Sequence, residues 1–141
     1  MSEIDNGKFG ADAILGDLNE AQELKEEGGE SVKEGKWRLA CAKYMSALAH
    51  LDGYSIGSAG RMCPSENPEY QLLWTGLLEQ HANLELSCHL NVSLCRLKSE
   101  EWAEAAEAAS CALRLVPRHP KALFRRGVAQ SRRSRCVEAG G

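Results

Sequence analysis

The most constraining feature of this sequence is a helical pattern that recurs along it. The first copy returns further along the chain, where Trp37, Ala40, Ala47 and Leu51 are matched at the same spacing by Trp102, Ala105, Ala112 and Val116. Another copy follows at about half that distance: Ser93, Arg96, Glu104 and Ala105 correspond to Gly127, Gln130, Glu138 and Ala139. A helical period of about 34 residues indicates a solenoid, in which each unit packs on its neighbours. We therefore expect an all-α binding scaffold rather than an enzyme.

Apolar residues at helical spacing, separated by glycine-rich and proline-rich segments, divide the chain into units. The repeat domain is expected over residues 17–131. Its expected parts and flanks are a flexible or partly helical leader (1–16), repeat 1 (about 21–52), an insertion loop (about 53–67), repeat 2 with an extended first helix (about 68–117), the first helix of repeat 3 (about 120–131) and a basic, disordered tail (132–141).

Several residues predict where the helices begin and end. Asp17 with an acidic residue three positions later resembles a helix-start cap, and Gly35 should end that helix. Asn67 before Pro68 predicts an N-cap followed by proline at the first helical position. Pro117 should end the second helix of repeat 2.

Small residues occupy the repeated positions at which two helices would approach closely. Gly28, Ser93 and Gly127 are equivalent in the repeat, and short side chains there allow tight helix packing. Trp37 and Tyr44 would fill the space around them. We interpret this stripe as core packing, because a solenoid buries apolar faces between adjacent helices.

Charge is nearly balanced overall, with 17 Lys and Arg against 20 Asp and Glu, but it is unevenly distributed. The N-terminal part is mainly acidic, whereas every formal charge between Arg114 and Arg135 is positive. The basic end therefore favours an acidic ligand or partner. No apolar run is long enough to span a membrane, and the first residues lack a signal-peptide pattern. We expect a cytoplasmic protein with reduced cysteines, most of them in helical cores.

Three segments carry a family resemblance: LKEEGGESVKEGKW (24–37), HLNVSLCRLKSEEWAEAAEAASCALRL (89–115) and KALFRRGVAQ (121–130). They resemble the tetratricopeptide repeat (TPR) family, and in particular the TPR domain of large immunophilin-type co-chaperones. The resemblance covers residues 21 to about 131. It implies an antiparallel helix-pair solenoid of about two and a half repeats, with a long insertion between repeats 1 and 2.

The resemblance also implies a binding site. Members of this subfamily often bind the acidic C-terminal peptide of a cytosolic heat-shock chaperone (Hsp90/Hsp70 class) through a carboxylate clamp. The matching clamp positions in this sequence are Lys25, Asn91, Lys121 and Arg125. One position departs from the family pattern, because Gly29 stands where an asparagine is usual.

The chemistry of these residues fits a peptide that ends in aspartate. Lys121 and Arg125 are four residues apart and so share a helix face. Two ammonium groups, a guanidinium fork and the Asn91 amide could bind both carboxylates by charge-assisted hydrogen bonds. Each residue alone could equally be a solvated surface charge or, for Asn91, a helix–helix contact. Gly29 removes one hydrogen bond, worth about 1.5–3 kcal/mol, so weaker binding is expected.

Two other functions compete with clamp binding. One is a structural adaptor that has an impaired clamp and binds a different protein. The apolar side of Leu123 and Val128 should lack an outer-helix partner, which would expose it or let it self-associate. The other is an accessory domain of a peptidyl-prolyl isomerase whose catalytic domain lies outside this chain.

Other candidate sites carry weaker signals. GYSIG at 53–57 matches a serine-nucleophile pattern but lacks the required strand and helix around it. His81, Cys88 and Cys95 recur at seven-residue spacing beside His89, without a pair spaced for a tetrahedral metal site. The arginine-rich end has only Phe124 for base stacking, which argues against nucleic acid. No catalytic residue, metal, cofactor or small-molecule substrate is therefore expected.

Overall fold

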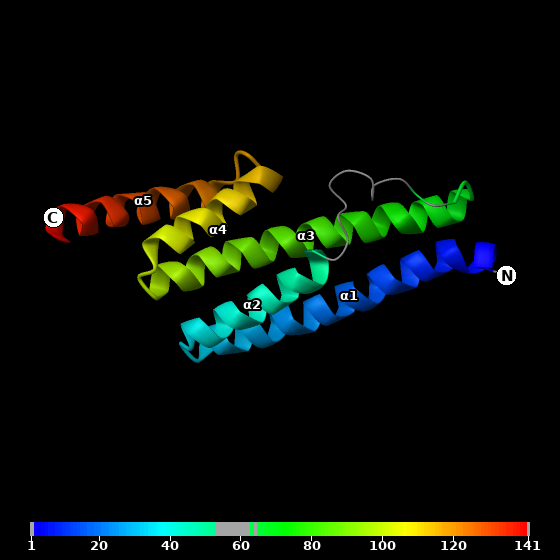
Figure 1. Cartoon of the computed structure of the whole chain (residues 1–141), viewed down its shortest axis with the longest axis horizontal. Coiled ribbons are helices and arrows are strands. Elements are labelled where there is room, and N and C mark those ends of the chain that lie inside the picture. The colour runs from blue at the N-terminus through cyan, green and yellow to red at the C-terminus, as the bar shows by residue number, and fades with distance from the viewer. Residues whose placement is uncertain (1, 53–62, 64, 141) are drawn as a thin grey trace.

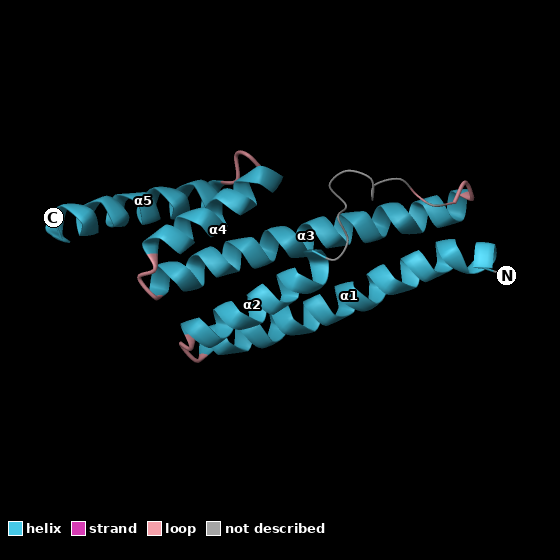
Figure 2. Cartoon of the chain, in the orientation of Figure 1, coloured by secondary structure: helices cyan, strands magenta, loops and turns pink. Residues whose placement is uncertain are grey.

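Five α-helices make up the part of the chain that the computed structural model describes, residues 2–52, 63 and 65–140. The helices are α1 (Ser2–Lys33), α2 (Trp37–Asp52), α3 (Pro68–Lys98), α4 (Trp102–Leu115) and α5 (Pro120–Gly140). Figure 2 shows that this described part contains helices and loops and no β-strand. The predicted all-α class is confirmed.

The helices stack in chain order, as Figure 1 shows. Each helix packs against the next one, and α3 also contacts α1 and α5. The odd-numbered helices therefore form one layer of the stack, which we call the inner helices, and α2 and α4 form the outer layer. This arrangement of antiparallel helix pairs is the expected TPR-type solenoid.

The two turns that lead from an inner to an outer helix have the same backbone conformation. Gly35 has φ 73° after α1, and Glu100, at the equivalent position of the next repeat, has φ 59° after α3. In both turns the next amide donates to a carbonyl five positions back, Lys36 N to Ser31 O at 2.9 Å and Glu101 N to Arg96 O at 2.8 Å. A left-handed residue with this hydrogen bond is a common way to end a helix. The two repeats are therefore alike in the backbone conformation of this turn as well as in their side chains.

Two cation–π contacts also follow the repeat. The Lys98 ammonium lies 5.7 Å from the centroid of the Trp37 ring, and the Arg132 guanidinium lies 6.0 Å from that of Trp102. The two tryptophans begin the outer helices, and the two cations, one repeat apart, lie on the inner helices that follow. Each outer helix is thus attached to the next inner helix by the same kind of contact.

The hydrophobic core is largest between α1, α2 and α3. Leu18, Leu51 and Cys88 are almost fully buried there, one on each helix. Toward α5 the core becomes smaller and consists mainly of alanine, including Ala122 and Ala129 on α5 itself. Because alanine buries little apolar area, α5 is held by less hydrophobic free energy than the first three helices.

Two predicted helix starts can be compared with the structure in the first half of the chain. The Asn67 cap is confirmed, since its Oδ1 accepts hydrogen bonds from the Glu69 and Tyr70 amides at 2.9 and 3.4 Å. The predicted helix start at Asp17 is wrong, because α1 already begins at Ser2 and includes the expected leader. Ile14, only 3% exposed, joins the core and favours this extension.

The disordered tail expected over 132–141 is also wrong over the described residues, because α5 continues past the predicted end near residue 131 to Gly140. No proline or glycine interrupts residues 128–139, and arginine, alanine and glutamine are good helix formers. The contact of Arg132 with Trp102 also lies in this extension. Most of the expected insertion loop, residues 53–62 and 64, lies outside the described residues.

The small repeat positions do not all have the role expected for them. A Cβ added to Gly28 would lie 2.8 Å from the buried Tyr44 ring, so this glycine is required for the packing of α1 on α2. Ser93 is fully buried, in agreement with the same role. A Cβ on Gly127 would meet nothing within 4 Å, because no described helix packs against α5 at this point. The close-packing interpretation therefore does not hold for Gly127.

The adjacent glycines in α1 provide a matched test of this packing. Gly28→Ala should lower the free energy of unfolding by about 1–3 kcal/mol, because the new methyl group overlaps the Tyr44 ring. Gly29→Ala should raise it by about 0.5–1 kcal/mol, because nothing lies within 4 Å and alanine favours the helix. Urea denaturation of both variants measures the difference. Equal effects of the two substitutions would show that the Tyr44 contact does not restrict residue 28.

The left-handed Glu100 gives a second stability test. Glu100→Gly should raise the free energy of unfolding by about 1 kcal/mol, because glycine adopts a positive φ without the steric cost that a Cβ carries. Ser99→Gly is the control, since Ser99 has φ −88° and gains nothing from glycine. Denaturation midpoints of the two variants should therefore move in opposite directions. A loss of stability in Glu100→Gly would contradict the strain assigned to this turn.

Candidate functional site

The predicted clamp residues all lie on the inner helices. Lys25 is on α1, Asn91 on α3, and Lys121 and Arg125 on the first turns of α5. Because α3 contacts both α1 and α5, the three helices present these residues from one layer of the solenoid. Lys25, Asn91 and Arg125 are half-buried, and Lys121 is exposed.

Arg125 is fixed in place by α3. Its Nη1 donates a hydrogen bond of 2.6 Å to the carbonyl oxygen of Leu90, the residue before Asn91. Burial lowers the pKa of Arg125, which nevertheless stays charged at neutral pH. The guanidinium carries five N–H donors, and this bond uses one of them. Arg125 can therefore hold α5 against α3 and still bind a carboxylate.

Lys25 lies on α1, and its charge acts on Cys88 of α3. Burial raises the pKa of the Cys88 thiol to about 11, and the nearby Lys25 charge acts in the opposite direction. Cys88 is three positions before Asn91, so the two share one face of α3. Lys25 from α1 therefore acts on α3 at Cys88, and Arg125 from α5 binds α3 at Leu90, both within one turn of Asn91 along the sequence.

Lys25 and Lys121 lack the glutamate partners that several other lysines of the domain have. Neither forms an ion pair with any described residue, whereas Lys33, Lys36 and Lys43 each pair with a glutamate of the domain. Asn91 likewise has no side-chain hydrogen bond within the described segments. Three of the four predicted clamp residues therefore keep their polar groups available to a ligand.

The departure at Gly29 leaves open space. This glycine is half-buried within α1, one turn after Lys25, and a Cβ added to it would meet nothing within 4 Å. The backbone is helical there and accepts any L-residue without strain. The position therefore has room for the Cβ that an asparagine would add.

Other residues considered from the sequence have structural roles. His81 is 5% exposed, and its Nε2 lies 2.9 Å from the Leu51 carbonyl, which can only accept, so this nitrogen carries the proton. Cys88 and Cys95 are fully buried in the core of the inner helices. The serine-nucleophile pattern at 53–57 lies outside the described residues.

A separate cavity of about 420 Å³ lies between α2, α3 and α4. Leu48 and Val92 contribute apolar surface, and His89, Arg96 and Glu104 contribute polar groups. Burial lowers the pKa of His89, which favours its neutral form. None of the predicted clamp residues lines this cavity. This concave surface is formed in part by the outer helices α2 and α4.

Comparison with known proteins agrees with the fold and with the resemblance of the sequence. The chain is 30% identical over 112 residues to the Arabidopsis thaliana peptidyl-prolyl cis-trans isomerase PASTICCINO1, and 32% identical over 114 residues to the Mus musculus isomerase FKBP4. Both alignments cover 79% of this chain but only 15% and 21% of the relatives. This chain thus spans about a fifth of the length of these relatives or less. No protein-family model matches it.

The structure is similar to the C-terminal TPR-containing domain of a Plasmodium falciparum protein described as FK506-binding. The TM-score is 0.64 at 28% identity, over 82% of this chain and 67% of the other. The chain is therefore a TPR domain, and it resembles the TPR domains of immunophilins. Such a domain is a protein-interaction module. Within the described residues, no helix combines the length and apolar character that crossing a bilayer requires.

Proposed function

We propose that this domain binds the acidic C-terminal peptide of a heat-shock chaperone of the Hsp90/Hsp70 class, as a non-catalytic co-chaperone module of the cytoplasm. The observation that supports the proposal is that Lys25 and Lys121 form no ion pair among the described residues, although they lie on helices that contact α3, the helix of Asn91. The prolyl isomerases among its relatives support a role as the accessory domain of such an enzyme.

The charges of the site fit a terminal aspartate, which carries two carboxylates. Lys25 and the remaining donors of Arg125 would bind one carboxylate group close to α3, and Lys121 would bind the other at the exposed edge of α5. The Asn91 amide would donate to an oxygen between them. Because three of the four residues are half-buried, these hydrogen bonds would be less screened by salt than those on an open surface.

A titration with two forms of one peptide tests the clamp. A Glu-Glu-Val-Asp peptide with a free C-terminus should bind, and its C-terminal amide should bind at least about tenfold more weakly, because the amide removes one of the two carboxylates. Lys121→Ala should weaken binding of the free acid by about 10-fold to 100-fold. Calorimetry at two salt concentrations measures both effects.

Arg133→Ala is the matched control for Lys121→Ala. It removes one positive charge from an exposed position of the same helix, away from the proposed clamp, and should change the affinity by less than about twofold. Equal affinity for acid and amide, or equal effects of the two substitutions, would contradict a specific clamp.

Gly29→Asn tests the missing member of the clamp by a gain of affinity. The new Cβ has room, and the amide would add one hydrogen bond to a charged group, so the free-acid peptide should bind about tenfold more tightly. Gly29→Ala is the control, because it also removes the glycine from the helix but adds no donor. If alanine and asparagine raise the affinity equally, residue 29 does not contact the peptide.

A second candidate function is an adaptor that binds a different protein or a second copy of itself. The apolar residues of α5 favour it, since Leu123 is 43% and Phe124 71% exposed on the side not covered by any described helix. An exposed apolar face of this kind is typical of interaction surfaces. The adaptor would be indifferent to the free carboxylate of the peptide, so the same acid-against-amide titration separates it from the clamp.

A further inference from the structure

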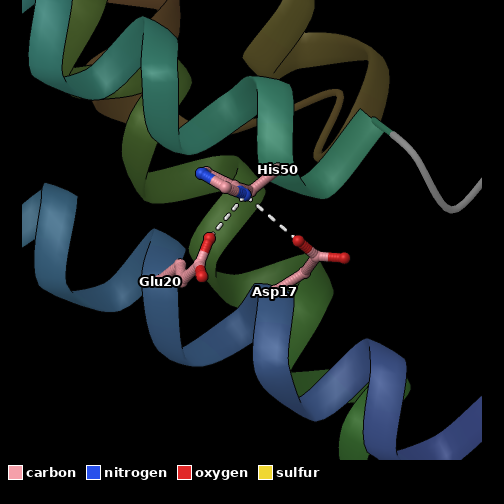
Figure 3. Close-up of side chains that lie close together, drawn as sticks. All are labelled: Asp17, Glu20 and His50. Atoms are coloured by element: carbon pink, nitrogen blue, oxygen red, sulfur yellow. Dashed lines mark hydrogen bonds and ion pairs between the residues drawn. The ribbon is translucent and has the colours of Figure 1, made fainter.

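Three side chains of metal-ligand type converge at a place remote in sequence from the clamp residues of α3 and α5. Figure 3 shows Asp17 and Glu20 of α1 directed toward His50 of α2. His50 Nδ1 lies 3.0 Å from Asp17 Oδ1 and 3.1 Å from Glu20 Oε2. One ligand atom from each residue lies within 4.8 Å of the other two. The sequence did not predict this cluster, because His50 is far from Glu20 along the chain and no spacing rule joins them.

The two helices hold these side chains firmly. Asp17 and Glu20 are three positions apart and so share a face of α1. Leu18 and Leu51, the neighbours of Asp17 and His50 in sequence, are each only 1% exposed in the core. The side chains of Asp17 and His50 are themselves about two-thirds buried, at 30% and 34% exposed. The cluster is thus built on packed helices and stays open to solvent on the Glu20 side, where exposure is 60%.

The cluster brings together more acceptor groups than the single Nδ1 of His50 can satisfy. Nδ1 carries at most one hydrogen, so it cannot donate a full bond to both carboxylates. Tetrahedral ligands about 2.1 Å from a zinc ion are separated from one another by about 3.4 Å. The observed N···O separations of 3.0 and 3.1 Å are within about 0.4 Å of this value. Two carboxylates and a neutral imidazole also provide a charge of −2, which a divalent ion neutralises.

We propose that Asp17, Glu20 and His50 form a binding site for a divalent transition-metal ion, with Zn²⁺ as the leading candidate. Imidazole nitrogen is a ligand that zinc accepts readily, whereas Mg²⁺ and Ca²⁺ prefer sites made of oxygen alone. Water would complete the coordination on the open side. The ion joins α1 to α2, so it stabilises the first helix pair.

Zinc titration of the full chain, followed by ¹⁵N NMR of the histidine side chains, tests the site. Cys63→Ser, Cys111→Ser and Cys136→Ser provide the background, because these three thiols are not buried and would bind zinc themselves. One equivalent of Zn²⁺ should shift the His50 Nδ1 signal, and the same amount of Mg²⁺ should not. In this background, His50→Gln, Asp17→Asn and Glu20→Gln should each weaken zinc binding by about 10-fold to 100-fold.

Glu23→Gln is the matched control for Glu20→Gln, because it removes the same charge from an exposed position of α1 outside the cluster. It should leave zinc affinity unchanged. Circular dichroism of each variant verifies that the helices are intact, and Glu20, as the most exposed ligand, can be replaced with the least effect on folding. An unmoved His50 signal at about tenfold excess of Zn²⁺, or equal affinities of Glu20→Gln and Glu23→Gln, would overturn the proposal and leave an ion pair only.

Discussion

Helix α3 packs against each of the other four helices, and the rest of the structure depends on these contacts. It closes the large core with α1 and α2, supports the alanine-rich packing of α4, and binds α5 through the Leu90 carbonyl and the Arg125 guanidinium. The helices that carry the other predicted clamp residues, α1 and α5, both pack against α3. A change in how α3 packs would therefore move the two sides of the proposed site together.

The fold could be predicted from the sequence because small, aromatic and apolar residues recur at a fixed spacing in each repeat. Gly28, the tryptophans and the Asn67 cap each act through nearby backbone or through a neighbouring helix at a fixed offset, so their roles can be inferred from spacing. Helix ends were less predictable. Gly7, Gly10 and Gly16 suggested a loose leader, whereas α1 runs through all three. Tertiary packing, seen at the buried Ile14, outweighs the small cost of glycine in a helix.

Parts of the candidate sites could not be predicted from the sequence at all. Arg125 donates its hydrogen bond to the backbone carbonyl of Leu90. Because every residue has such a carbonyl, the type of residue at position 90 gives no indication of this bond. The meeting of His50 with Asp17 and Glu20 depends on the antiparallel register of α1 and α2 and on which rotamers the side chains adopt. Patterns along one helix reveal which residues share a face, but not which residues of another helix oppose them.

The cations of the inner helices are of two kinds: some contact a tryptophan ring, and others have no partner among the described residues. Lys98 and Arg132 occupy equivalent positions, and each lies over the tryptophan that begins the preceding outer helix, so their charges are used in packing. Lys25 and Lys121 are on the same layer of helices, yet neither pairs with an aromatic ring or a carboxylate of the described residues. Burial lowers the pKa of Arg125, because the folded domain holds this guanidinium partly out of water. An acidic ligand that binds the folded state would offset this desolvation, so its binding should be linked to greater stability of the whole helix stack.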